Sequence, residues 1–448
     1  LLSSTDKLMF NDASQFIQGA SATVLDIAAT DEIELTATLI DVVGNLTVSG
    51  TSVTTGTINT LGMTGPKTNF ANSILISGDA GTGTLNAASG NTGVGIGVLG
   101  ALTTGDNNVA VGYVALDANT TGSANVGIGA SALDKNTTAS SNTAVGTLSL
   151  YSNTTGASNT AVGRSALQEN TTAANNTAIG ANALDANTTG ADNTAIGTSA
   201  LTANTTGAEN VSLGFKAMLY GTTGDYNVAL GACTLGGAEV NTGDHNIAIG
   251  RKSMFANGTG DNNVAVGSDS LKNNTTANNN VAIGLCALEQ NSTGADNTAI
   301  GALALDGNTT AAGNTAVGKS ALYANTTGAG NVAVGTNALI ANTTASNNIA
   351  IGCGALCKTT TGDPNTAIGH ASMICNVTGE YNTAVGYLTL NKNTASSNTA
   401  IGMNGMKQNT TGANNTAVGA NALDANTTAA GNTAVGTVSL SSNTTGFN

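Results

Sequence analysis

The chain has 448 residues and few side chains that could carry chemistry. Charged residues make up 8% of it and aromatic residues 3%, with 2 His, 5 Cys and no Trp. The net charge is −14 and Lys plus Arg number only 12, so the basic surface of a nucleic-acid-binding protein is missing. No run of about 18 apolar residues occurs, and we therefore expect no membrane insertion.

The first 59 residues contain short pieces in which apolar and polar residues alternate, for example at 24–27 and 46–48. Strands this short do not readily form an independent sandwich. They resemble the interleaved trimeric β-structure of phage fibre shafts, in which segments such as GNLTVSGT at 44–51 are common. We predict a β shaft region over 1–59, with a small separate β-domain as the alternative. Residues 60–90 are rich in Gly, Ser, Asn and Thr and are predicted to be a connector.

An internal repeat begins at Asn91 and is predicted to continue as one domain over 91–448. Its unit reads N-(T/V/I)-A-(V/I)-G-x-x-A-L-x-x-N-T-T-G-x-x, and the Gly that ends the first block, here called the marker Gly, occurs 21 times from Gly95 to Gly436. The step between marker glycines is 17 residues except for 19 after Gly231 and 16 after Gly386. Because a one-residue slip would turn a strand over, we expect these two irregularities to lie in turns.

The columns of the repeat predict a coil that stacks on copies of itself. Thr143, Ala144 and Val145 are typical of a strand, with Ala144 on the face opposite its neighbours. Gly146 permits a bend, Leu150 is expected to lie in a second short strand, and the NTTG segment is typical of a turn. So small a unit cannot hold a core alone. The fold class is therefore predicted as all-β, a parallel β-solenoid of about 21 coils.

Asn stands four residues before the marker Gly in all 21 copies. Identical amides about 4.8 Å apart along a stack form a hydrogen-bonded ladder. We predict this structural role for Asn142, Asn159, Asn176 and Asn193.

The column two residues before the marker Gly contains only Ala, Gly or Ser. Each coil offers about two large aliphatic side chains, which is little burial against the entropy of ordering 17 residues. Two interpretations follow. The small column marks a face where three chains approach closely, or it fills the narrow interior of a single chain.

The block N-(T/V)-A-(V/I)-G resembles the head repeats of trimeric autotransporter adhesins, and the form NTAVGxxALxxNTTG is similar to repeats in phage and algal-virus fibre proteins. The adhesin heads are left-handed parallel β-rolls in trimers. The resemblance implies a homotrimer with the small column at its axis, represented by Ala144, Ala161, Ala178 and Ala195. It also implies a roll core that contains Val145, Leu150, Val162, Leu167, Ile179 and Leu184.

Catalytic, cofactor and metal sites are not expected. His245 and His370 are about seven coils apart, the five Cys form no C-x-x-C pair, and the aspartates after turn glycines are explained by turn capping more simply than by calcium. The Asn-Thr-Thr triplets match the N-glycosylation sequon, although a repeated turn produces them anyway. We predict that the protein is not an enzyme.

The leading hypothesis is a structural fibre of a virion, such as a phage tail fibre, on the virion surface or otherwise extracellular. Its expected partners are further copies of itself, other fibre or virion proteins, and a host-surface receptor such as a glycan. The alternative is a bacterial surface adhesin or extracellular filament subunit. Ice binding is a third hypothesis because Thr columns recur, although adjacent Thr residues alternate faces. The repeat stops one residue before the next ladder Asn is due, which favours a polypeptide that continues.

Overall fold

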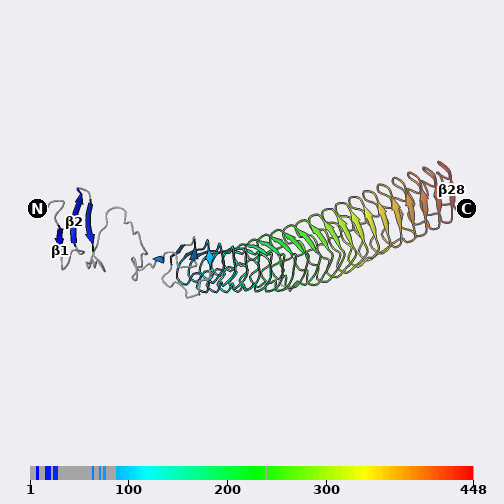
Figure 1. The fold of residues 1–448 in the computed structure, drawn as a ribbon. Helices are drawn as coiled ribbons and strands as arrows, with labels where there is room; N and C mark the ends of the chain where they lie inside the picture. The colour runs from blue at the N-terminus through cyan, green and yellow to red at the C-terminus, as the bar shows by residue number, and fades with distance from the viewer. Residues whose placement is uncertain are drawn as a thin grey trace. The chain divides into compact units, whose positions relative to one another are not determined.

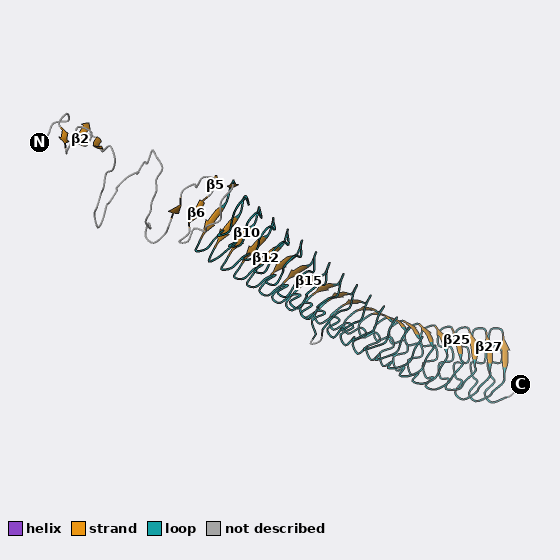
Figure 2. Ribbon diagram, turned by 60° about the horizontal axis from the view of Figure 1, so that its bottom comes forward, coloured by secondary structure: helices purple, strands orange, loops and turns teal. Residues whose placement is uncertain are grey.

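A computed structural model describes residues 87–237 and 240–446, together with six short strands that precede them. The chain divides into two units, Leu1–Thr55 and Gly56–Asn448, and each is considered by itself. Every regular element described is a β-strand (Figures 1 and 2).

In the first unit, β1 (Lys7–Met9), β2 (Phe16–Ser21) and β3 (Val24–Ala28) form one antiparallel sheet in the order β1-β2-β3. The piece predicted at 24–27 lies in β3, whereas the one at 46–48 falls outside the described residues. The interleaved shaft concerns contacts between chains and stays a prediction.

The second unit is a parallel β-solenoid with one three-residue strand in each of its 21 coils, β8 to β28. Its strands are β4 (Met63–Thr64), β5 (Phe70–Ala71), β6 (Ile74–Ile76), β7 (Ala88–Ser89), β8 (Thr92–Val94), β9 (Val109–Val111), β10 (Val126–Ile128), β11 (Thr143–Val145), β12 (Thr160–Val162), β13 (Thr177–Ile179), β14 (Thr194–Ile196), β15 (Val211–Leu213), β16 (Val228–Leu230), β17 (Ile247–Ile249), β18 (Val264–Val266), β19 (Val281–Ile283), β20 (Thr298–Ile300), β21 (Thr315–Val317), β22 (Val332–Val334), β23 (Ile349–Ile351), β24 (Thr366–Ile368), β25 (Thr383–Val385), β26 (Thr399–Ile401), β27 (Thr416–Val418) and β28 (Thr433–Val435).

Each strand pairs in parallel with the strand of the next coil. Residues at equivalent positions of the repeat are paired, for example Thr143 with Thr160. The register survives both irregular steps: Val228 pairs with Ile247 across 19 residues, and Thr383 pairs with Thr399 across 16. The extra and missing residues therefore lie in turns, as the sequence predicts.

The sheet begins earlier than the repeat. β6 pairs in parallel with β8, and β4 pairs antiparallel with β6 at the outer edge. Part of the segment predicted as a connector over 60–90 therefore belongs to the solenoid sheet. An antiparallel edge strand covers backbone groups that an open end of the stack would leave unpaired.

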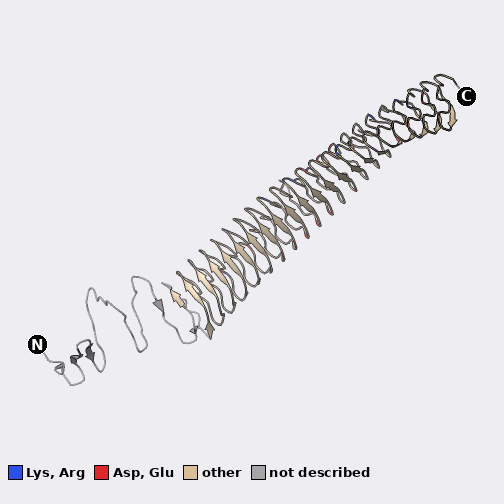
Figure 3. Ribbon diagram, turned by 90° about the horizontal axis from the view of Figure 1, so that it is seen from above, with Lys and Arg blue, Asp and Glu red and all other residues tan. Residues whose placement is uncertain are grey.

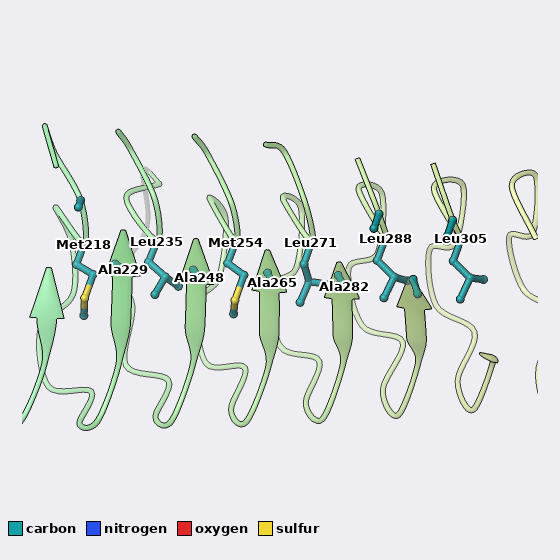
Figure 4. Packing of buried hydrophobic residues seen from close by; sticks show 14 of the residues in the cluster. Met218, Ala229, Leu235, Ala248, Met254, Ala265, Leu271, Ala282, Leu288 and Leu305 are labelled. Atoms are coloured by element: carbon teal, nitrogen blue, oxygen red, sulfur yellow. The ribbon is translucent and has the colours of Figure 1, made fainter. Parts of the chain in front are cut away.

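The interior of each coil is filled by small and medium side chains from opposite walls. The column of Ala144 comes from the strand, and the column of Leu150, in which Met replaces Leu in some coils, comes from the facing wall. Figure 4 shows these side chains meeting between the walls in the coils from Met218 to Leu305. Ala144 and Leu150 are both completely buried within one chain.

This placement corrects the expectation that the small column lines an axis between chains. Ala144, Ala161, Ala178 and Ala195 all point into their own coil and belong to its core. The reason is space: Leu from the opposite wall already occupies the thin interior, so the strand can contribute only a methyl group. The interpretation in which Ala fills a narrow single-chain interior describes the structure.

Because side chains alternate along the strand, three residues that were predicted in the roll core lie outside it. Val145 and Val162 are half-buried and Ile179 is 39% exposed, because their side chains point away from the coil that contains Ala144 and its equivalents. Leu150, Leu167 and Leu184 do lie in the core, each completely buried.

The segment after the marker Gly is a series of turns, which corrects the expected second strand. Leu148 and Leu150 have φ values of 61° and 48°, in the left-handed region. Leu148 N–H bonds to Ala130 O of the preceding coil, whereas Leu150 N–H bonds to Ala166 O of the following coil. The wall opposite the sheet is thus also hydrogen-bonded from coil to coil, without extended backbone.

Candidate functional surfaces of the solenoid

Two buried ladders of Asn side chains hold neighbouring coils together. In the first, Asn159 N–H donates to Asn142 Oδ1 at 2.9 Å, and Asn159 Nδ2 donates to Ala173 O at 2.8 Å. Asn176 and Asn193 repeat the pattern, with N–H to Oδ1 distances of 2.9 Å. Each Asn side chain therefore forms one hydrogen bond with a backbone N–H and another with a turn carbonyl. Both of these backbone groups are buried away from water.

The second ladder is formed by the first residue of the NTTG turn, which the sequence analysis assigned only to turn formation. Asn153 Nδ2 donates to Asn136 Oδ1 at 2.8 Å and to Gly156 O at 2.9 Å. Asn136 and Asn153 are completely buried. These are the sequon residues, so glycosylation at them is incompatible with the folded coil. The signal that points to this ladder is the recurrence of Asn at a second fixed position.

The marker Gly is required by the stacking distance. Gly163 has φ of 135°, and a Cβ there would lie 2.5 Å from Gly180 O and 2.6 Å from Gly180 C. Real Cβ atoms do not come so close to backbone, and the same φ is unfavourable for other residues. The column is therefore a contact between backbones of successive coils.

The position just before the first ladder Asn is also left-handed but is open to solvent. Its φ is 59° at Ser158 and 70° at Gly313, and a Cβ on Gly313 would have no atom within 4 Å. The column varies from Gly and Asn to Tyr226 and His245. This exposed column therefore varies among the copies, because no shared requirement of packing or hydrogen bonding restricts its side chains.

The outward side of the sheet behaves differently. We define the outward strand face as the first and third residues of β8 to β28, which point away from the coil interior. These 42 positions, two in each of 21 coils, contain only Thr, Val, Ile and Leu. Several are more than one-third exposed, including Ile179 at 39% and Leu213 at 45%. Figure 3 shows the strands without charge and the charged residues on the loops.

A second uniform column lies on the turn. Thr154 Oγ1 donates to Thr171 O at 3.1 Å, whereas its neighbour Thr155 is exposed and its hydroxyl has no partner among the described residues. The exposed Thr column is a single line, because the adjacent Thr column is half-buried and bonded to backbone.

The residues with reactive side chains are dispersed over the coils. His245 stacks on Tyr226 with ring centroids 4.9 Å apart, and His370 stacks on Tyr387 at 5.5 Å. Within the described residues no group of three His, Cys, Asp or Glu side chains is arranged to hold a metal ion. Burial, with a smaller effect of Glu289, raises the pKa of Cys286 to about 12, which keeps this thiol protonated.

The turn aspartates act as acceptors between coils. Asp225 Oδ1 accepts the Ala208 N–H at 2.7 Å, and Asp244 Oδ1 accepts the Asp225 N–H at 2.8 Å. Asp261 continues the series by accepting the Asp244 N–H at 2.8 Å. These contacts match turn capping, the simpler of the two roles weighed for them.

The described residues contain one small network of ion pairs. Lys272 Nζ lies 3.0 Å from Glu289 Oε1 and 3.3 Å from Asp269 Oδ1. In the next coil, Asp306 has a buried Oδ1 without a hydrogen bond. Burial, assisted by the nearby charge of Glu289, raises the pKa of Asp306 to about 6.

No protein-family model matches the chain, and no curated protein matches it. Among the described residues there is also no helix that could cross a membrane. The geometry defines the chain as a β-solenoid repeat protein, and its uniform surfaces carry the functional argument.

Proposed function

We propose that this protein is a structural fibre subunit, a rigid rod built from three copies that sits on a virion such as a phage tail and serves host attachment. The observation that carries the proposal is the outward strand face. It is partly exposed in the single chain, yet none of its 42 positions is charged or strongly polar. Strand propensity favours β-branched residues at these positions but does not exclude charged ones, whereas contact with another copy does.

The area of the outward strand face supports self-association. A three-residue strand is about 10 Å long, and 21 coils at about 4.8 Å extend for about 100 Å. The face therefore measures roughly 1,000 Å². In a trimer two neighbours share it, so each pair of chains buries roughly 1,000 Å² in total, about the minimum for a specific interface. Burying the β-branched side chains would supply the apolar burial that a lone thin coil lacks.

The proposals of a trimer and of a virion location rest on the resemblance to fibre and adhesin repeats. The fold changes one part of what the resemblance implies, namely the residues through which the chains meet. The Ala column is enclosed within each coil, so the chains would meet through Val145, Ile179 and their equivalents. Rigidity follows from the first Asn ladder, which bonds each coil to the next from Asn91 to Asn432. The second ladder adds to it but is interrupted at Gly221 and Thr359.

The location can be tested on purified virions from the source of the sequence. Peptides of this chain, found by mass spectrometry at a stoichiometry in multiples of three per particle and labelled by antibody on projecting fibres, are the expected result. Absence from particles would reject the virion assignment. Recovery from the bacterial cell surface would instead support the alternative, an adhesin or extracellular filament subunit.

A further inference from the structure

We infer that the lengthened coil after Gly231 carries a binding notch for an acidic sugar. The hollow has a volume of about 250 Å³ and is lined by Lys216, Leu219, Tyr220, Cys233, Gly236, Gly237 and Phe255. This volume is just below the usual range for small-molecule pockets, which suits one sugar ring.

The notch exists because two adjacent glycines occupy the wall opposite the sheet. The preceding coil places Leu219 and Tyr220 at these two positions, and the following coil places Phe255 at the first of them. A Cβ on Gly236 would collide with Lys216 O, and one on Gly237 would collide with Phe255 O. Neither of these two positions can therefore carry a side chain, and the hollow follows from the backbone of the described residues.

Aromatic side chains stand on both sides of the gap. Tyr220, from the preceding coil, is 40% exposed, and Phe255, from the following coil, is half-buried. Flat apolar ring faces favour a ligand that is itself a ring with an apolar face. The Tyr220 hydroxyl adds a group that can donate or accept a hydrogen bond.

Positive charge gathers at the same place on an otherwise acidic protein. Lys216 Nζ lies 5.2 Å from the Phe215 ring centroid, and Lys252 Nζ lies 5.6 Å from that of Phe255. Neither Lys is in an ion pair with a described carboxylate, whereas Lys272 is. An ammonium group on the rim that no described carboxylate neutralises favours an anionic ligand.

A pyranose ring with a carboxylate combines both requirements: its C–H face packs on Tyr220 or Phe255, and its carboxylate approaches Lys216. This inference deepens the proposed attachment function and rests on it for its biological meaning. The binding itself is independent of oligomeric state and particle location, so its failure would leave the fibre proposal untouched.

The experiment is saturation-transfer NMR on the full chain with glucuronate, using glucose as the neutral analogue that differs only at the carboxylate carbon. We expect glucuronate to give ring-proton signals that Tyr220→Ala abolishes, and Lys216→Gln to weaken its affinity by about tenfold. Tyr323→Ala is the matched control, because Tyr323 is 41% exposed on the same wall but away from the notch. Circular dichroism confirms that each variant remains folded.

Three results would overturn the inference. The inference requires glucuronate to bind more tightly than glucose, so equal binding of both would remove the role of charge. Loss of signal in Tyr323→Ala to the same degree as in Tyr220→Ala would remove the assignment to the notch. Absence of any glucuronate signal at tens of millimolar ligand, with folded protein, would remove the site itself.

Discussion

The backbone N–H of Asn193 donates a 2.9 Å hydrogen bond to Oδ1 of Asn176, seventeen residues earlier in the chain. Asn176 in turn donates from Nδ2 to Gly190 O at 3.0 Å. One buried side chain thus joins three segments from two coils. Because the same contact recurs along the stack, the stability of the rod is distributed over its coils.

Removing one ladder amide should open the rod locally. Asn176→Ala leaves the Asn193 N–H buried without its acceptor, at about 1–3 kcal/mol. The Gly190 carbonyl loses one of its two donors and keeps the bond from Asn187 Nδ2. Hydrogen exchange followed by mass spectrometry should show faster exchange in the coils around residue 176 and little change in distant coils. Thr172→Ala, which removes an exposed hydroxyl, is the control. Equal protection in the two variants would contradict a ladder that bears stability.

Substitution of a marker Gly should be far more damaging than substitution of a turn Gly that also has a positive φ. Gly163→Ala forces Cβ into the Gly180 carbonyl, whereas Gly313→Ala meets no atom within 4 Å and bears only the left-handed strain, about 1–2 kcal/mol. Urea unfolding of both variants measures the difference. Similar losses would show that stacking distance is not what selects glycine.

Relief of strain at an exposed turn should stabilise the rod. Ala124 has φ of 56°, a value that glycine adopts freely. Ala124→Gly removes about 1–2 kcal/mol of strain and adds an entropy cost of about 0.5–1 kcal/mol, for a net gain of at most about 1.5 kcal/mol. Protection of amides in the neighbouring coils should rise. A fall in protection would contradict the left-handed assignment.

Asp306 makes the stability depend on pH. Its pKa in the folded chain is about 6, above its ordinary value of 3.8, so the folded state holds this proton more tightly than the unfolded chain. The destabilising contribution is absent below pH 3.8, grows as the pH rises toward 6, and is complete above that. Discounted for its partial exposure, it amounts to about 1 kcal/mol.

The Asp306 effect is measured by urea unfolding between pH 4 and 8. Asp306→Asn should remain as stable as the native chain at pH 4 and become more stable by about 1 kcal/mol at pH 8. The comparison is made between the two chains at each pH, because Asp134 and Asp185 also have raised pKa values and affect both equally. A difference independent of pH would contradict the assignment.

Much of the solenoid is predictable from sequence because its constraints recur in register. The marker Gly, the first Asn column and the tolerance of irregular steps in turns all follow from residue types at fixed spacing. Alternation along Thr143, Ala144 and Val145 separates two faces but does not say which one points inward. That depends on the opposite wall, where Leu150 leaves room only for a methyl group.

The wall opposite the sheet was harder to predict for a related reason. Leu is uncommon in the left-handed region, so the apolar character of Leu150 indicates a strand rather than a turn. Hydrogen bonds to both neighbouring coils hold this backbone, and such contacts exist only once the coils stack. The notch, by contrast, has a local signal in the sequence: Gly236 and Gly237 replace side chains found in neighbouring coils.

The central claim is that copies of the rod meet through the outward strand face, and the mass of the full chain by sedimentation equilibrium tests it most directly. We predict three times 43.5 kDa for the native chain and 43.5 kDa for Ile179→Lys combined with Ile283→Lys, which places two charges on that face. Leu285→Lys, exposed on a neighbouring bend, should keep the native mass. A native chain that sediments as a single copy at micromolar concentration would contradict the account.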